Sequence, residues 1–464
     1  MSRDTTIARA EAFFDDGRFF DLIARWVACP TESQNEACTN PLQDYLVREI
    51  TPYLEGMDFS CRIVDNPVNP RLPFLIGQRD EGEDLPTVLI YGHGDTVMSM
   101  QGEWREGLEP WRMIKEDDRW YGRGSADNKG QHAINLAALA CVLAEKGRLG
   151  FNVKVLIEMG EEMGSPGLHE ICSREKESLK ADVLIASDGP RIDPTKPTIF
   201  GGSRGVFNFD LHLDLREGGH HSGNWGGLLA NPGIILANAI SSMVDKHGRI
   251  LIEDLKPDGI PESVRRALAE LEVTGEKGPE IDPYWGEPGL SLSEKVYGWN
   301  TLEVIALECG NPSNPVHAIP PSAWARCHIR YVVGSRPQQF IAAVRKHLDA
   351  NGFEKIQIIE VRTSYGGATR LNPGNPWVKW AVRSFENTSG QQPAFLPNLG
   401  GTLPNDAFSD ILGLPTIWVP HSYGGCSQHA PDEHLLAPIV REGLRLMTGL
   451  FWDLAGQPPD ANTP

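Results

Sequence analysis

Five residues of the types that bind metal ions are spread along this chain, most of them directly after a short apolar run. They are two histidines and three acids: His93, Asp127, Glu162, Asp188 and His429. Two imidazoles and three carboxylates can hold a pair of borderline divalent cations when one carboxylate is shared between them. Glu161, next to Glu162, could take the proton of an attacking water. The set indicates a hydrolase with a two-metal centre.

The apolar runs before these residues predict strands of a mostly parallel sheet. Strands are expected at 87–90, 153–159, 183–186 and 416–419, and a helix at 128–146 that Gly147 ends. Strands that alternate with helices are typical of an α/β domain whose sheet is covered on both faces. Binding crevices in such sheets lie beyond the carboxyl ends of the strands. His93, Glu162 and Asp188 follow predicted strand ends, so one crevice could collect them.

Each motif taken alone also has an ordinary structural interpretation. Asp95 could orient His93 from behind as the partner of a metal ligand, or it could simply cap a histidine at the end of a strand. Asp127 precedes the predicted helix, where aspartate commonly caps the N-terminus. Glu161 and Glu162 could both be solvated at a turn. The ordered set of five is harder to explain by chance than any one motif.

An α+β insertion is predicted within the α/β domain. Segments 206–215 and 325–333 alternate apolar and polar residues, as half-buried antiparallel strands do, and helices are expected near 232–244 and 337–350. We therefore expect a first part of the catalytic domain at 1–202, the insertion at 203–366, and a second part of the catalytic domain at 367–464.

The composition limits the classes of binding partner that the chain is expected to have. The chain has 464 residues, and 43 basic against 62 acidic side chains give a formal charge of -19. Such a charge disfavours nucleic acid and anionic membranes as partners. The eight cysteines are scattered without a CxxC pair, which favours free thiols in a reducing cytoplasm. The first thirty residues predict an amphipathic helix and no secretion signal, and no apolar run is long enough to span a bilayer.

The ordered motifs resemble those of one known superfamily. The segments HGDTV, GRGSADNKG, GEE, SDG and QHAPDE occur in that order along the chain. They resemble the dinuclear zinc peptidase and deacylase superfamily, which includes carnosinase-like dipeptidases, carboxypeptidase G, aminoacylases, acetylornithine deacetylase and succinyl-diaminopimelate desuccinylase. The resemblance implies a zinc-peptidase-like catalytic domain that is interrupted by an α+β lid and dimerisation domain, and hence a homodimer.

The resemblance also implies how the ligands divide. His93 and Asp188 would hold one zinc ion, Glu162 and His429 would hold the other, and Asp127 would bridge the two. Two divalent ions are therefore expected as cofactors. Zinc is the first choice, and Mn²⁺ or Co²⁺ also fit such ligands.

Three further roles in catalysis follow from the same resemblance. Asp95 would orient His93, and Glu161 would be the general acid and base. The segment 220–227, HHSGNWGG, resembles a lid segment in which the histidine of one subunit reaches the partner's active site and stabilises the oxyanion. His221 is the aligned residue and His220 the competing one, while a plain polar loop is the alternative.

Substrate contacts are implied for four more residues. Arg330 matches a lid arginine that binds the substrate carboxylate, a group that suits a planar guanidinium; the alternative is a surface arginine on a strand. Gly401 and Thr402 lie in a segment that resembles a glycine-rich loop binding the same end of the substrate. His317 stands where carnosinase-like relatives carry a threonine, which leaves the specificity open.

The sequence thus predicts a cytoplasmic metal-dependent hydrolase that cleaves the amide bond of a dipeptide or N-acyl amino acid with a free carboxylate. One alternative is a deacylase or carbamoylase that acts on a bulkier or non-peptide amide. Another is a non-catalytic relative that binds amino-acid-like ligands, which the complete ligand set disfavours.

Overall fold

A computed structural model of the chain describes residues 2–273, 280–361, 366–456 and 458–459. The chain divides into two compact units. Unit 1 contains Met1–Gly202 and Arg370–Pro464, and unit 2 contains Ser203–Val273 and Glu280–Thr369. The boundary expected at 366–367 adjoins residues 362–365, which lie outside the described residues.

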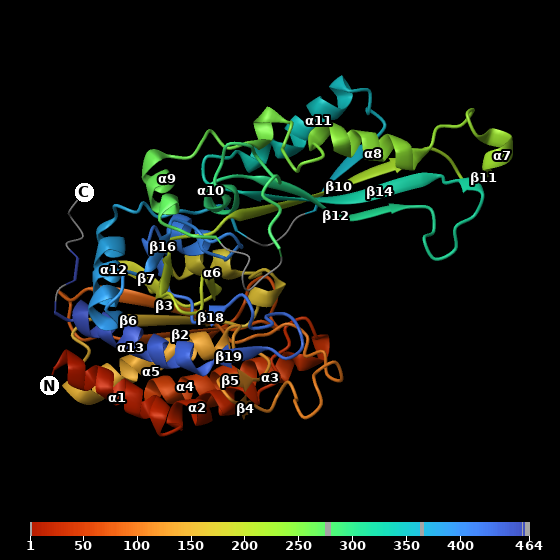
Figure 1. Ribbon diagram of the computed structural model, residues 1–464. Helices are drawn as coiled ribbons and strands as arrows, with labels where there is room; N and C mark the ends of the chain where they lie inside the picture. The colour runs from red at the N-terminus through yellow and green to blue at the C-terminus, as the bar shows by residue number, and fades with distance from the viewer. Residues whose placement is uncertain (1, 274–279, 362–365, 457, 460–464) are drawn as a thin grey trace. The chain divides into compact units, whose positions relative to one another are not determined.

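A large sheet forms the centre of unit 1 (Figure 1). Its eight strands are, in spatial order, β1 (Ser60–Val64), β2 (Phe74–Arg79), β6 (Asn152–Glu158), β3 (Thr87–His93), β7 (Val183–Ala186), β17 (Thr416–Trp418), β9 (Thr198–Phe200) and β16 (Ala394–Leu396). The pairs β6–β3, β3–β7, β7–β17 and β9–β16 are parallel. The prediction of a mostly parallel α/β sheet is confirmed, and β1 and β2 add an antiparallel edge that the sequence did not predict.

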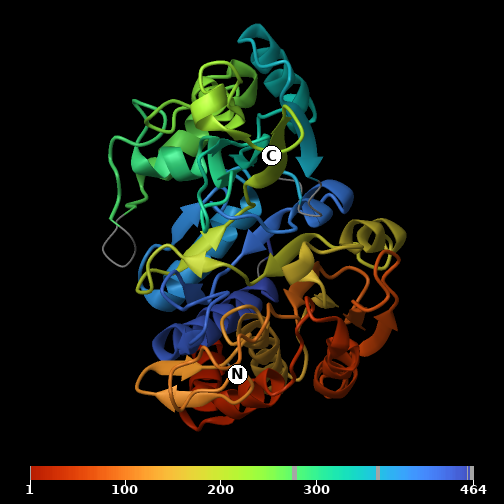
Figure 2. The ribbon, with the colours of Figure 1, turned by 90° about the vertical axis from the view of Figure 1, so that its right-hand side faces the viewer.

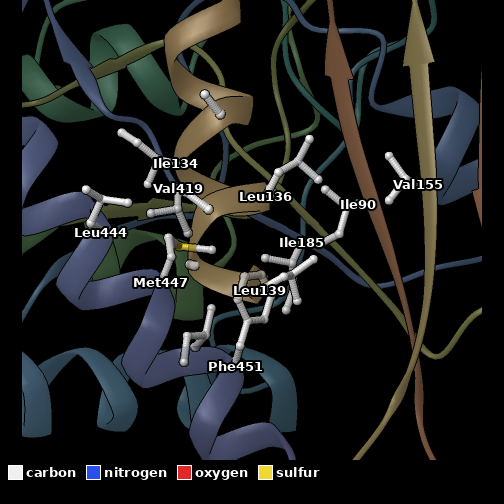
Figure 3. Packing of buried hydrophobic residues seen from close by; sticks show 14 of the residues in the cluster. Ile90, Ile134, Leu136, Leu139, Val155, Ile185, Val419, Leu444, Met447 and Phe451 are labelled. Atoms are coloured by element: carbon white, nitrogen blue, oxygen red, sulfur yellow. The ribbon is translucent and has the colours of Figure 1, made fainter. Parts of the chain in front are cut away.

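The main core of unit 1 lies between this sheet and a layer of helices. The layer contains α1 (Arg3–Asp15), α5 (Lys129–Lys146), α12 (Pro376–Ser389) and α13 (Ala437–Leu454), which contact one another. Figure 3 shows Ile90 and Ile185 of the sheet beside Leu139 of α5 and Phe451 of α13, and all four side chains are fully buried. Burying such side chains is the main force that holds the sheet in place beneath the candidate site.

The opposite face of the sheet is also covered. Tyr91 alternates with Ile90 along β3, so its ring points to this other face, where it lies 4.9 Å from the ring of Phe408. Phe408 belongs to η6 (Ala407–Ile411), which packs on α6 (Leu168–Arg174). The sheet is therefore covered on both faces, as the apolar strands predicted.

The N-terminal segment differs from the prediction of one helix. It forms α1 and then α2 (Arg18–Val27), and the break falls at Gly17, which has a φ of 86°. Glycine adopts this left-handed conformation without the steric cost that other residues bear. The chain can therefore turn sharply between the helices, and the prediction of a single helix is wrong at this point.

Shorter elements complete unit 1. They are η1 (Glu36–Cys38), α3 (Thr39–Asp44), η2 (Tyr45–Ile50), α4 (Thr51–Glu55), η3 (Glu161–Met163), the sheet of β4 (Ile114–Glu116), β5 (Arg119–Tyr121) and β19 (His434–Leu436), and the pair β8 (Pro190–Arg191) and β18 (Ser422–Tyr423). β19 runs antiparallel to β5, with His434 opposite Tyr121. This pair brings two loops from distant parts of the sequence to the same place.

Unit 2 is an α+β unit with a sheet that has helices on one face. Its antiparallel strands are, in spatial order, β12 (Thr301–Cys309), β14 (Ser322–Tyr331), β10 (Gly205–Asp214) and β15 (Gln357–Val361). Along β14 the fully buried Cys327 and Ile329 alternate with the half-buried His328 and Arg330. The helices α8 (Pro232–Met243) and α11 (Phe340–Ala350) cover the apolar face and contact each other (Figures 1 and 2).

Small elements extend from the sheet of unit 2. They are the pair β11 (His220–His221) and β13 (Ala318–Ile319), and the helices α7 (Ser222–Trp225), η4 (Glu253–Leu255), α9 (Glu262–Ala269), α10 (Leu292–Tyr297) and η5 (Pro337–Gln339).

Candidate metal centre

The structure brings all five predicted ligands of unit 1 together in two groups that share Asp127. In the first group, His93 Nε2 lies 3.0 Å from Asp127 Oδ1 and 3.5 Å from Asp188 Oδ2. In the second, His429 Nε2 lies 3.1 Å from Asp127 Oδ2 and 3.1 Å from Glu162 Oε2. The two oxygens of one carboxylate thus face different histidines, an arrangement suited to bridging two cations.

Parallel strands explain how His93, Glu162 and Asp188 converge. His93 is the last residue of β3, Asp188 follows the end of β7, and Glu162 lies in η3 just after β6. These three strands are neighbours in the sheet and run in the same direction. Their carboxyl ends therefore meet at one edge of the sheet, where the predicted crevice lies.

The residues present fit a metal ion. Within each group, one ligand atom from every residue lies within 4.8 Å of the others. Glu162 Oε1 is buried and has no hydrogen-bond partner among the described residues, and an unpaired buried carboxylate oxygen is costly. Nitrogen and oxygen donors in this proportion suit borderline divalent ions such as zinc. A cation held by Asp127, Glu162 and His429 would offset the charge of this carboxylate.

Asp127 does not cap the following helix. α5 begins at Lys129, and its N-cap residue is Asn128, which makes no side-chain capping bond. The Asp127 carboxylate instead faces the two histidines. The helix-capping alternative for this aspartate is therefore wrong.

Asp95 contacts both His93 and the turn that carries Glu161 and Glu162. Its carboxylate oxygen Oδ1 lies 3.3 Å from His93 Nδ1, on the side of the ring away from Asp127. The same carboxylate accepts hydrogen bonds from the backbone N–H groups of Glu161 and Glu162, each at 3.1 Å. An oriented imidazole is a better metal ligand, and the same aspartate fixes the turn that carries the two glutamates.

The acidic groups of the centre have strongly altered proton affinities. Burial raises the pKa of Glu161 well above its usual range, and Glu162 adds to the rise while His93 opposes it. Burial likewise raises the pKa of Glu162 to about 7. Asp127 is buried too, but hydrogen bonds with His429 and His93 hold its pKa well below the usual range. Burial makes the carboxyls of Glu161 and Glu162 resist ionisation, and a bound cation would supply the counter-charge that favours their ionised form.

The other predicted residues lie in different places. Gly401 and Thr402 belong to unit 1, in the loop between β16 and η6. That loop contacts the turn after Asp188, because a Cβ placed on Gly189 would lie 3.1 Å from Leu399 Cδ2.

His221, His317 and Arg330 all belong to unit 2. His221 on β11 pairs with Ala318 of β13, and the backbone oxygen of His317 accepts the N–H of Ser222 at 2.8 Å. The two histidines are therefore near each other, and both are exposed.

Arg330 lies at the edge of a cavity of about 670 Å³ in unit 2, lined also by Arg204, His328 and Glu303. Burial and the charge of Arg330 lower the pKa of Arg204 to about 10. The cavity thus contains neighbouring positive charges.

Two supporting contacts were not predicted. Gln34 Nε2 donates to the backbone oxygen of Glu162 at 3.1 Å, and Gln428 Nε2 donates to Asp127 Oδ2 at 3.3 Å. Nothing in the sequence near Gln34 points to Glu162, which is 128 residues away. Gln428 could have been found, because it adjoins a predicted ligand.

The fold and the site together define a metal-dependent hydrolase. The sequence model of peptidase family M20/M25/M40 matches residues 89–453. The chain belongs to this family and is a metallopeptidase. No helix in the described part of the chain is long and apolar enough to cross a membrane.

Named relatives match over most of the chain. The sequence is 25% identical over 460 residues to the Beta-Ala-His dipeptidase of Rattus norvegicus, covering 94% of this chain and 93% of that protein. It is 27% identical over 343 residues to the cysteinylglycine-S-conjugate dipeptidase of Corynebacterium striatum, covering 71% and 72%. The solved structure of the di-peptidase Dug1p from Saccharomyces cerevisiae aligns with a TM-score of 0.79 at 21% identity, covering 98% and 99%, and shows the same fold.

Proposed function

We propose that this protein is a two-metal dipeptidase that cleaves the amide bond of a dipeptide, or of an N-acyl amino acid, beside a free carboxylate. The observation that carries the proposal is the pair of three-residue ligand groups that share Asp127, with the buried Glu161 next to one of them. The names of the relatives support it, since both similar proteins are dipeptidases.

Each ligand group would hold one divalent ion, with zinc the first choice and Mn²⁺ or Co²⁺ as alternatives. His93 and Asp188 would hold one ion, Glu162 and His429 would hold the other, and Asp127 would serve both. Divalent ions held there would lower the pKa of water toward about 7 and polarise the carbonyl of the substrate. Asp95 keeps the ring of His93 oriented toward the ion, since it faces the other ring nitrogen at 3.3 Å.

Glu161 is the general base and then the general acid. Its side chain is buried and belongs to neither ligand group, so both carboxylate oxygens remain available for proton transfer. Glu161 takes a proton from the attacking water and returns it to the departing nitrogen. Cations next to Glu161 would lower its pKa from the raised value that burial causes, toward the range a base needs.

Residues of unit 2 and of the 400–402 loop recognise the substrate. Arg330 binds the free carboxylate through its planar guanidinium, and Arg204 lines the same cavity together with Glu303. Gly401 and Thr402 bind the same end of the substrate through the loop, and His317 helps to set the specificity.

His221 stabilises the oxyanion, so His221→Ala is expected to lower kcat by about 10²–10³-fold without changing the metal content. The loss follows because a hydrogen-bond donor aimed at the developing charge is removed. Steady-state kinetics and elemental analysis of the same preparation measure both quantities. His220→Ala is the matched control and should change kcat little; unchanged turnover in His221→Ala would assign the role elsewhere.

A second copy of the chain binds through β12 and α8 of unit 2. β12 is an edge strand of the sheet, and Val304, Ile305 and Leu307 on it are exposed, as is Ile234 on the neighbouring α8. Exposed apolar edge strands readily pair with another chain.

Ile305→Asp is therefore expected to convert a homodimer into a monomer, because a charge would be buried at the pairing edge. Sedimentation equilibrium measures the mass. Ile359→Asp on β15, the opposite edge of the sheet, should leave the dimer intact. A wild-type chain that sediments as a monomer contradicts the proposed dimer.

The substrate and metal are tested together on protein stripped with a chelator. Dipeptides and N-acyl amino acids are assayed after Zn²⁺, Mn²⁺ or Co²⁺ is restored, and dipeptide cleavage with at least one ion is expected. Hydrolysis of bulky non-peptide amides alone would favour the deacylase alternative.

All eight cysteines are free thiols, which supports a reducing cytoplasm as the place of action. Cell fractionation tests this location.

A further inference from the structure

A buried ion pair lies between the two loops that carry Asp127 and His429. Because β5 and β19 are antiparallel, with Tyr121 opposite His434, the loops 122–127 and 427–433 leave the same end of the pair. Arg123 Nη1 donates to Glu433 Oε2 at 2.8 Å, and both side chains are only 1% exposed. A charged pair so deep in the protein is costly unless its other hydrogen-bonding groups find partners nearby. Most of them do, although Arg123 Nε has none among the described residues.

The Glu433 carboxylate binds the backbone of the Asp127 loop. Oε2 accepts the N–H of Gly124 at 2.9 Å, and Oε1 accepts the N–H groups of Ala126 at 2.8 Å and Asp127 at 3.0 Å. With the bond from Arg123, four donors converge on one carboxylate, which fills its usual capacity. The backbone of Asp127 is thereby fixed from the opposite loop.

Arg123 in turn holds the His429 loop. Its Nη2 donates to the backbone oxygen of Ala430 at 3.0 Å, directly after His429. Ser427, His429 and Asp432 all have positive φ angles near 60°. Residues other than glycine adopt this conformation at an energetic cost, so surrounding contacts must maintain it. His429 is 57% exposed and receives little restraint from packing.

We propose that Arg123 and Glu433 are positioning residues for Asp127 and His429, two of the three ligands in the group that also contains Glu162. They fix the separation of Asp127 from His429 through the backbone, without serving as ligands themselves. The inference rests on the proposed two-metal function. Its effect should be larger for the ion of this group, because Asp127 and His429 both belong to it. In the other group only Asp127 depends on the ion pair, since His93 and Asp188 are positioned by the strands β3 and β7.

Glu433→Gln tests the proposal. Both oxygens of Glu433 accept backbone N–H groups, so the amide NH₂ would face a donor in either orientation. Chelator-stripped protein is titrated with Zn²⁺ in competition with a chromophoric chelator. We expect one ion to bind at least about 10-fold more weakly than in the wild type, as for other residues that orient ligands, and the other ion to change less. Raising free Zn²⁺ should restore activity.

Glu81→Gln is the matched control for a general loss of stability. Glu81 also accepts two backbone N–H groups, from Leu149 and Gly150 at 2.7 Å, and pairs with Arg79 at 3.1 Å. It belongs to neither ligand group. This variant should unfold at a lower temperature than the wild type, yet bind both ions with wild-type affinity.

Arg123→Lys provides a second variant if Glu433→Gln fails to fold. Lysine keeps the charge next to Glu433 but lacks the fork that reaches both Glu433 and Ala430, so weaker binding of one ion is again expected. If folded Glu433→Gln and Arg123→Lys bound both ions with wild-type affinity, the positioning role would be wrong while the proposed function would stand. The same conclusion would follow if Glu81→Gln weakened ion binding as much as Glu433→Gln does. A wild-type protein that binds no ion would overturn the proposed function as well.

Discussion

Replacing Glu161 with alanine is expected to lower kcat by about 10²–10⁴-fold while the protein keeps its metal ions. Glu161 lies in neither ligand group, so its loss removes a proton carrier and leaves the donors of the ions unchanged. The turn should keep its shape, because Asp95 binds the backbone N–H groups of residues 161 and 162 rather than their side chains. Steady-state kinetics and elemental analysis measure the two effects.

The adjacent glutamate is the natural control. Glu162 faces His429 at 3.1 Å and belongs to a ligand group, so Glu162→Ala should lose one ion as well as activity. Excess metal should then improve Glu162→Ala and leave Glu161→Ala inactive. Near-normal turnover in Glu161→Ala would show that another group carries the proton.

The sheet was predictable from sequence because its signal is local. Apolar runs such as 183–186 coincide with strands, and parallel strands necessarily bring residues at their carboxyl ends together. His93, Glu162 and Asp188 are therefore placed in one crevice by the sequence pattern alone. Gly17 shows the limit of the same reasoning, since the first thirty residues predicted one helix, whereas the left-handed backbone of Gly17 separates α1 from α2.

The supports of the site were not predictable in the same way. Glu433 binds the Asp127 loop across about 306 residues of sequence, and Gln34 binds the backbone of Glu162 across 128. Such contacts leave no periodic pattern, because they depend on how distant segments meet in the folded chain; the Glu433 contact, for example, depends on how β5 and β19 pair. The ligand types identified the chemistry, whereas the geometry that orients them came only from the folded chain.

Asp127→Ala is expected to weaken the binding of both ions, by more than about 100-fold each, because removing a ligand costs more than disturbing its orientation. The Asp127 carboxylate faces His93 with one oxygen and His429 with the other, at 3.0 and 3.1 Å. Asp188 belongs only to the group of His93, so Asp188→Ala should weaken mainly one ion. Competition titration with Zn²⁺ distinguishes the two patterns.

The same variant also tests how much the bound metal contributes to the stability of the fold. An ion present at about 1,000 times its Kd stabilises the folded state by about 4 kcal/mol, so a chelator should lower the Tm of the wild type substantially. Asp127→Ala should show almost no response to the chelator, and Asp188→Ala an intermediate one. If Asp127→Ala instead retained both ions and the full response, Asp127 would not be the bridge. The two ligand groups would then have to act independently, although their histidines face the same carboxylate in the folded chain.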